Sequence, residues 1–183
     1  MRLTFIAGCL LAFFAMQLSA QTKAKDGPLV DFELMTWPEL KHAIHDEGKT
    51  TVLLFNGGTE QRGPQGIAGA HTLISRVLGR EIARKLGNAI VGPVLPYSLN
   101  NANAELPGTI GISGPLFAAL NEEVSEQLIV NGFKNVVLMG DHGGGQKELA
   151  EVAKKLDAKY AGKGIRVVYC NDVYEKVGKD FNA

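Results

Sequence analysis

Short, almost entirely apolar runs alternate with longer amphipathic runs along this chain, and this alternation constrains its fold more than any other feature. The apolar runs cover residues 50–55, 89–95, 135–139 and 165–169. Continuous apolar strands separated by helices are typical of βαβ units around a parallel sheet that is buried on both faces. We therefore predict an α/β fold, a three-layer α/β/α sandwich around a mostly parallel sheet, with right-handed crossovers.

Helical patterns join these strands. Thr36 is a candidate cap, Pro38 suits a first turn and Glu39 lies three residues after the cap, so a helix is expected to begin here and run to about His45. Further helices are expected over residues 73–86, 116–130 and 146–160. Residues spaced three to five apart form the apolar faces of the first two: Leu73, Val77, Ile82 and Leu86, then Leu116, Leu120, Val124 and Leu128.

The N-terminus has the pattern of a secretory signal. One arginine precedes an apolar run over residues 3–18, and the small residues Ser19 and Ala20 precede the expected cut. A membrane anchor is the weaker interpretation, because the run is short for a bilayer and lacks a charged stop-transfer flank. A lipoprotein box ending at Cys9 is weaker still, since few apolar residues precede it.

The resulting organisation is a signal peptide (1–20), a flexible lead-in (21–33) and one domain (34–183). Export predicts a secreted or periplasmic protein with no membrane contact after cleavage. The formal net charge is zero, so no basic excess attracts nucleic acid, and we expect no nucleic-acid partner. Only Cys170 remains after cleavage, so no internal disulfide is expected.

Two loops carry residues suited to chemistry. The first covers residues 56–64 and continues to His71, and the second covers residues 140–145. Each follows an apolar strand, and ligands of open parallel sheets bind beyond the carboxyl ends of the strands. Carboxylates and imidazoles are ligands of divalent ions. The candidates are Glu60, His71, Asp141 and His142. The plainer interpretation is that Glu60 pairs with Arg62 on the surface while the glycines only turn the chain.

Competing motifs are incomplete. The 140–145 loop lacks the Lys-Ser/Thr ending of a P-loop, and residues 111–115 lack the last glycine of a G-x-S-x-G nucleophile turn. Ser113 is better explained as a helix cap. The polar, Asn-rich segment 97–105 is interpreted as a solvated loop, or alternatively as part of the mouth of the site.

Several stretches together resemble the creatininase family, in order and in spacing. They are Trp37-Pro38-Glu39, residues 57–64 (GGTEQRGP), residues 106–109 (LPGT) and residues 140–144 (GDHGG). The similarity covers about residues 34–177. The resemblance implies an α/β/α sandwich, hexameric assembly, and hydrolysis of C–N bonds in cyclic or formyl amides by a pair of divalent ions, zinc or manganese.

The resemblance carries over residue by residue, with departures. Glu60 and His142 match metal ligands of the family. Arg62 stands where the family has the histidine of Glu-x-His, and a guanidinium cannot ligate a metal. His71 stands where the family has a bridging aspartate, and Gly145 where asparagine is usual. The family domain continues for about another third, so this chain resembles its N-terminal two-thirds and is expected to be truncated.

Two functional hypotheses follow. In the first, the chain is a metal-dependent amidohydrolase of a small-molecule amide. Glu60, His71 and His142 then hold one Zn or Mn ion, Asp141 is a fourth ligand or general base, and Arg62 binds an anionic substrate or stabilises an oxyanion. In the second, the chain is an inactive relative or fragment that binds a small ligand or a partner. The first requires Glu60 and His142 to face each other closely enough to share an ion.

Overall fold

The structure, a computed structural model, describes residues 27–100, 104–172 and 174–176. The expected signal peptide (1–20) and the first part of the expected lead-in (21–26) lie outside these residues. Within the described ranges, no helix combines the length and apolar character needed to cross a membrane.

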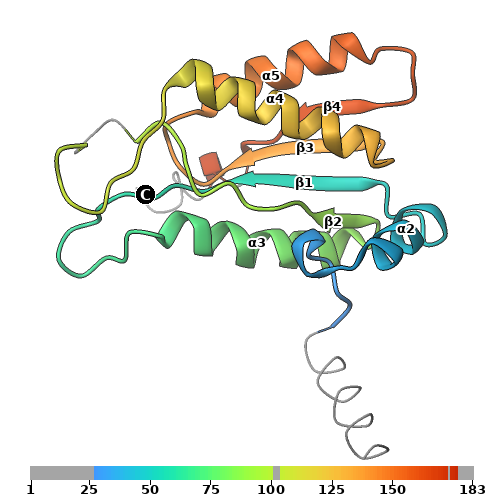
Figure 1. Ribbon diagram of the computed structural model, residues 1–183, viewed down its shortest axis with the longest axis horizontal. Coiled ribbons are helices and arrows are strands. Elements are labelled where there is room, and N and C mark those ends of the chain that lie inside the picture. Colours follow the sequence, from blue (N-terminus) through green and yellow to red (C-terminus); the bar gives the residue numbers. More distant parts are fainter. Residues whose placement is uncertain (1–26, 101–103, 173, 177–183) are drawn as a thin grey trace, which may run out of the picture.

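The described residues form a four-stranded parallel sheet. The strands are β1 (Thr51–Asn56), β2 (Ala89–Val91), β3 (Asn135–Gly140) and β4 (Arg166–Tyr169), in the order β2-β1-β3-β4 (Figure 1). Every residue of the central strand β1 is buried, as expected for a strand covered on both faces. β2 ends sooner than its apolar run predicts, because Gly92 and Pro93 follow it and proline cannot donate a ladder hydrogen bond.

Helices cover both faces of the sheet. They are α2 (Trp37–His45), α3 (Ala70–Leu86), α4 (Gly114–Val130) and α5 (Gln146–Lys159), with a short 3-10 helix, η1 (Phe32–Leu34), before them. Figure 1 shows α4 and α5 on one side of the sheet and α3 on the other. One core cluster joins α2, α4 and α5 to the sheet, and a second joins α3 to the opposite face. The predicted α/β class is confirmed, with helices flanking a parallel sheet.

The segment before η1 packs onto the sheet edge. Val30 and Asp31, which fall within the expected lead-in, are both buried. The carbonyl of Val30 accepts the Val91 N–H at 2.7 Å, and Nε of Arg80 donates to both carboxylate oxygens of Asp31, at 2.8 and 3.0 Å. The folded part of the chain therefore includes residues 30 and 31.

The buried face of α3 differs from the one that its leucines indicate. Leu73 and Val77 are 51% and 59% exposed, and Leu86 is also exposed. The buried residues are instead Ser75, Gly79 and Ala83. The helix lies very close to the sheet, since a Cβ on Gly79 would be 3.0 Å from Cγ1 of Val91. Small side chains occupy the closest approach between the two layers, so Leu73, Val77 and Leu86 are exposed, whereas Ile82 of the expected face packs against the second core cluster.

A similar shift occurs in α4. Leu116 is exposed, whereas Phe117, Asn121, Ser125 and Leu128 are buried. Asn121 is buried because it accepts a 2.9 Å hydrogen bond from Nδ2 of Asn56 at the end of β1. A polar pair therefore occupies part of an interface that the sequence pattern assigned to leucine. Ser113 takes the N-cap position of α4 as predicted, but its side chain makes no capping hydrogen bond.

Candidate metal centre

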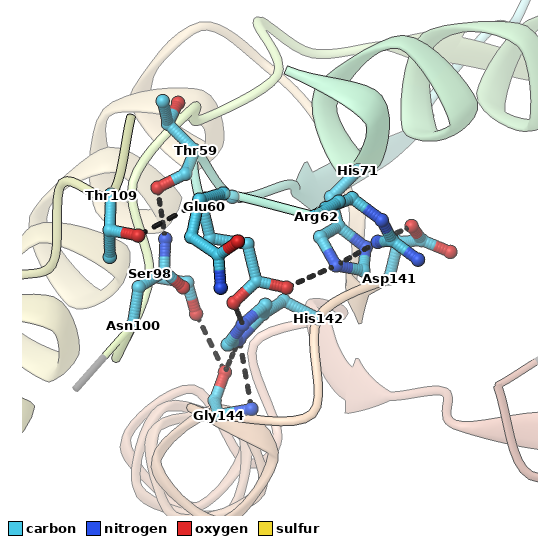
Figure 2. Close-up of polar contacts among 12 residues, drawn as sticks. Thr59, Glu60, Arg62, His71, Ser98, Asn100, Thr109, Asp141, His142 and Gly144 are labelled. Carbon is cyan, nitrogen blue, oxygen red and sulfur yellow. Dashed lines mark hydrogen bonds and ion pairs between the residues drawn. The ribbon is translucent and has the colours of Figure 1, made fainter. Parts of the chain in front are cut away.

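The register of β1 and β3 brings the two candidate loops together. Asn56 at the end of β1 pairs with Gly140 at the end of β3, and the Asp141 N–H donates to the Asn56 carbonyl at 3.0 Å. The first loop then runs into α3, whose first turn carries His71, and the second runs into α5. Side chains more than eighty positions apart in the chain, such as Glu60 and His142, therefore meet at one edge of the sheet (Figure 2).

The carboxylate of Glu60 lies between two imidazoles. Its Oε1 is 3.1 Å from Nε2 of His71, and its Oε2 is 3.1 Å from Nε2 of His142. The two rings meet edge to face, with centroids 5.0 Å apart. One ligand atom from each of the three residues lies within 4.8 Å of the others. Glu60 and His142 thus satisfy the spatial condition that the first hypothesis requires.

His142 is held by backbone and by glycines. Its Nδ1 lies 2.9 Å from the backbone nitrogen and 3.3 Å from the carbonyl oxygen of Gly144, while its Nε2 faces Oε2 of Glu60 (Figure 2). A Cβ on Gly58 would be 3.3 Å from the ring, and a Cβ on Gly144 would be 2.4 Å from the Leu99 carbonyl oxygen. These glycines let the chain pass close to the imidazole, because a side chain at either position would collide with neighbouring atoms.

His71 is oriented by Asp141. Oδ2 of Asp141 is 2.7 Å from Nδ1 of His71, so that nitrogen carries a proton and Nε2 points toward Glu60. Metal-binding histidines commonly donate their second nitrogen to a carboxylate in this way. Asp141 therefore contacts the far side of the His71 ring and does not join the three ligand atoms, which places it as an orienting group.

The pKa values of the cluster reflect these contacts. Burial raises the pKa of Glu60, but its contacts with the His142 and His71 imidazoles outweigh this effect, and the net shift is downward. The hydrogen bond from Asp141 raises the pKa of His71 above its usual value, with support from Glu60 and against the opposing effect of burial. The cluster therefore favours an ionised Glu60.

Arg62 reaches the same imidazole from the outside. Its Nη1 is 2.6 Å from Nε2 of His71, and the residue is exposed. No ion pair between Arg62 and a carboxylate is found in the described part of the chain. The surface pair between Glu60 and Arg62, expected under the plainer interpretation, is therefore not formed.

Buried polar residues that the sequence did not indicate support both loops. Asn100 is 1% exposed and its Nδ2 donates to the Thr59 carbonyl at 2.7 Å, while Oγ of Ser98 donates to the Gly144 carbonyl at 2.6 Å. Nε2 of Gln146 donates to the His142 carbonyl at 2.6 Å. The interpretation of 97–105 as a solvated loop is thus wrong at Ser98 and Asn100, while residues 101–103 lie outside the described ranges. An Asn-rich run without periodicity carries no signal for this role.

The structure also explains Gly145. It caps α5 with φ +97°, in the left-handed region, and a Cβ there would be 2.7 Å from Cε1 of Phe117. An asparagine side chain does not fit at this position, so the departure from the family pattern follows from the packing of Phe117 beneath the loop.

Comparison with known proteins decides the family. The sequence profile of the creatininase family, described as creatinine amidohydrolase, matches residues 33–181. The chain belongs to the creatininase family. A search among curated proteins found no match to it.

Solved creatininases share the fold. A structure described as creatininase Mn has 22% identity and a TM-score of 0.67, covering 78% of this chain and 58% of its own. A creatininase variant complexed with creatine has 22% identity and a TM-score of 0.64 over the same shares. A Zn–Zn variant has 22% identity and a TM-score of 0.61. This chain therefore spans about 58% of the length of these creatininases.

The residues present fit a divalent ion. One carboxylate and two imidazoles form a donor set that zinc accepts readily and manganese tolerates. Asp141 already directs the lone pair of His71 toward the other two ligands. Within the described residues this is the one such grouping, so this member of the creatininase family offers ligands for a single ion at this edge of the sheet.

Proposed function

We propose that this creatininase-family chain is a metal-dependent amidohydrolase that cleaves a carbon–nitrogen bond in a small, cyclic amide. One Zn or Mn ion is held by Glu60, His71 and His142. The observation that carries this proposal is the convergence of one ligand atom from each of these residues within 4.8 Å. The convergence is supported by a backbone contact from Gly144 and a side-chain contact from Asp141, so it does not depend on the three side chains alone.

The protein groups around the ion have separate tasks. When bound, a divalent ion polarises the amide carbonyl and lowers the pKa of a water molecule. Asp141 is a positioning residue that keeps a proton on Nδ1 of His71 and so leaves Nε2 free to ligate. Glu60 supplies negative charge beside both imidazoles. Arg62 supplies a fixed positive charge at the cleft, suited to an anionic group of the substrate or to an oxyanion.

Metal analysis and turnover test the proposal. Purified protein is loaded with Zn or Mn, dialysed and analysed for metal, and hydrolysis of creatinine and of hydantoin is followed by chromatography. We expect about one ion per chain. Glu60→Gln should lose both ion and hydrolysis, because the amide keeps the shape of the carboxylate but not its charge. Glu123→Gln, on the exposed side of α4, is the matched control. Absence of a stoichiometric ion after loading contradicts the proposal.

A second function, binding without catalysis, is favoured by Arg62. Its guanidinium contacts Nε2 of His71, the atom that the ion needs. A non-catalytic creatininase relative would retain this contact and bind a small ligand or a partner at the same cleft. A protein that holds no ion after loading, yet remains folded and binds creatinine in calorimetry, would establish this function instead.

We also propose that the chain is exported to the periplasm or the medium, with cleavage after Ala20, and that it assembles as a homo-oligomer. The support for export is the pattern of residues 1–20. Expression in a Gram-negative host, fractionation and N-terminal sequencing test it. We expect the periplasmic form to begin at Gln21, and full-length protein in the cytoplasm would contradict the proposal.

A further inference from the structure

Two different interactions would use the same nitrogen of His71. Because Nδ1 donates to Asp141, Nε2 of the neutral ring has one lone pair to offer. Nη1 of Arg62 lies 2.6 Å from Nε2, within hydrogen-bond distance, and can donate into that lone pair (Figure 2). The same lone pair is the one that His71 would contribute to a metal ion.

These two uses exclude each other. A lone pair that accepts an N–H hydrogen bond cannot at the same time ligate a cation. The guanidinium of Arg62 keeps its charge at all ordinary pH values, so it cannot give up a proton and stay beside a bound ion without repulsion. Binding of an ion at His71 must therefore displace Arg62.

Displacement leaves Arg62 without a partner among the described residues. Its one polar side-chain contact there is with His71, no described carboxylate pairs with it, and the residue is exposed. It extends from the loop that also carries Glu60, so it stays beside the three candidate ligands. A planar guanidinium matches a carboxylate with two parallel hydrogen bonds, which makes a carboxylate its most suitable new partner.

We propose that Arg62 and a divalent ion compete for Nε2 of His71, and that the ion releases Arg62 to bind the carboxylate of a negatively charged amide substrate. This inference rests on the proposed function and names its substrate class. Binding linkage is reciprocal, so a carboxylate ligand that occupies Arg62 should also raise the affinity of the protein for the ion.

The competition is tested by calorimetric titration of Zn into metal-stripped protein, comparing wild type with Arg62→Met. Methionine keeps much of the length of the side chain and removes its charge and donors. Because a charge-assisted hydrogen bond no longer opposes the ion, we expect Arg62→Met to bind Zn about tenfold more tightly or better. Arg76→Met is the matched control, since Arg76 is a half-exposed arginine of α3 paired with Glu33, and its Zn affinity should equal that of wild type. Circular dichroism and thermal melting confirm that the variants are folded.

The substrate class is tested with a matched pair of probes, N-acetylglycine and N-acetylglycinamide, which share an amide and differ in one carboxylate. We expect the Zn-loaded wild type to bind the acid at least about tenfold more tightly than the neutral probe, and Arg62→Met to lose this preference. A preference that survives in Arg62→Met would show that the carboxylate binds the ion directly, and would overturn the role assigned to Arg62.

The outcomes separate this inference from the function on which it rests. Equal Zn affinity in wild type and Arg62→Met would overturn the competition while the metal-dependent function stands. Failure of wild type and both variants to bind Zn would overturn the proposed function and this inference together. Tighter Zn binding by Arg62→Met, with loss of the preference for N-acetylglycine, supports both.

Discussion

Asp141 determines which nitrogen of His71 faces the cleft. The short contact between Oδ2 of Asp141 and Nδ1 of His71 fixes both the tautomer and the orientation of the ring. An imidazole needs an acceptor behind it to present the correct nitrogen, and Asp141 is that acceptor for His71.

We therefore expect Asp141→Asn to lower Zn affinity by about tenfold to a hundredfold, because the amide holds the His71 ring less firmly and can favour the wrong tautomer. Titration calorimetry measures the change. Asp46→Asn is the control, since Asp46 contacts Nδ1 of His42 at 2.8 Å on the exposed side of α2, far from the cluster. Unchanged Zn affinity in Asp141→Asn would show that His71 does not ligate through Nε2.

Gly145 offers a test of the packing beneath the second loop. Gly145→Ala should reduce the free energy of unfolding by more than the roughly 1–3 kcal/mol typical of a strained backbone position, because its Cβ also meets the Phe117 ring. Urea denaturation measures the loss. Gly162→Ala is the matched control, with φ +76° but no atom within 4 Å of the added Cβ. Equal losses in the two variants would mean that the Phe117 contact has no cost.

Much of the candidate site follows from the sequence, for a physical reason. Parallel strands deliver their following loops to one edge, so Glu60, Asp141 and His142 could be expected near one another because each follows an apolar strand. The individual contacts could not be predicted from the sequence. Whether Asp141 ligates a metal or orients His71 depends on the rotation of the His71 ring. The hydrogen bonds from Ser98 and Asn100 to the two loops depend on tertiary packing. Neither leaves a periodic pattern.

At the scale of elements, Asp157 fastens α5 to β4. Its Oδ1 accepts hydrogen bonds from Nε of Arg166 at 2.9 Å and from the Val167 N–H at 3.0 Å. The Arg166 hydrogen bond, followed by that of the Val167 N–H, lowers the pKa of Asp157 below its usual value. A lowered pKa contributes stability above the unfolded-state pKa, and this contribution is lost as pH falls through the folded-state pKa.

We expect hydrogen exchange at the Val167 amide, corrected for its intrinsic pH dependence, to lose protection as the pH falls through the lowered pKa of Asp157. Asp157→Asn should show reduced protection already at neutral pH, because the amide oxygen is a weaker acceptor than a carboxylate. NMR exchange rates measure both effects, with the Val136 amide of β3 as internal reference. Identical protection in the two proteins at neutral pH would contradict the proposed fastening.

The positions of helices and strands follow well from the sequence, but the buried faces of α3 and α4 do not. Apolar spacing located both helices because it marks a 3.6-residue period. It assigned Leu128, Val124 and Ile82 to the packed faces correctly, but it missed the small and polar residues beside them because the distance between layers is a tertiary property. Gly79 faces β2 at very close range, and Asn121 of α4 is hydrogen-bonded to Asn56. Small and polar residues are then buried where leucines would otherwise be expected.

At the scale of the whole molecule, that orientation leaves an apolar surface on α3. Leu73, Ile74 and Val77 are adjacent on the helix and all exposed. A contiguous patch of exposed apolar side chains often marks an interaction surface, whereas single exposed apolar residues are common on any protein. This surface is a suitable contact for the homo-oligomer that the family resemblance implies.

We expect the double variant Leu73→Lys, Val77→Lys to shift the chain to a smaller species, because two charges at this surface oppose close packing. Size-exclusion chromatography with light scattering measures the mass. Leu86→Lys is the control, an equally exposed leucine at the other end of α3. A wild-type chain that is already monomeric, or a double variant of unchanged mass, would remove this surface from the assembly.

The pairing of Asn56 with Gly140 has a practical consequence. Glu60 precedes α3, His71 lies in its first turn and His142 follows β3, so no short stretch of the chain contains all three candidate ligands. A divalent ion would be retained only by molecules whose central strands have already joined. Metal content would then serve as a quality check during purification, since misfolded or nicked material would emerge from a desalting column without its ion.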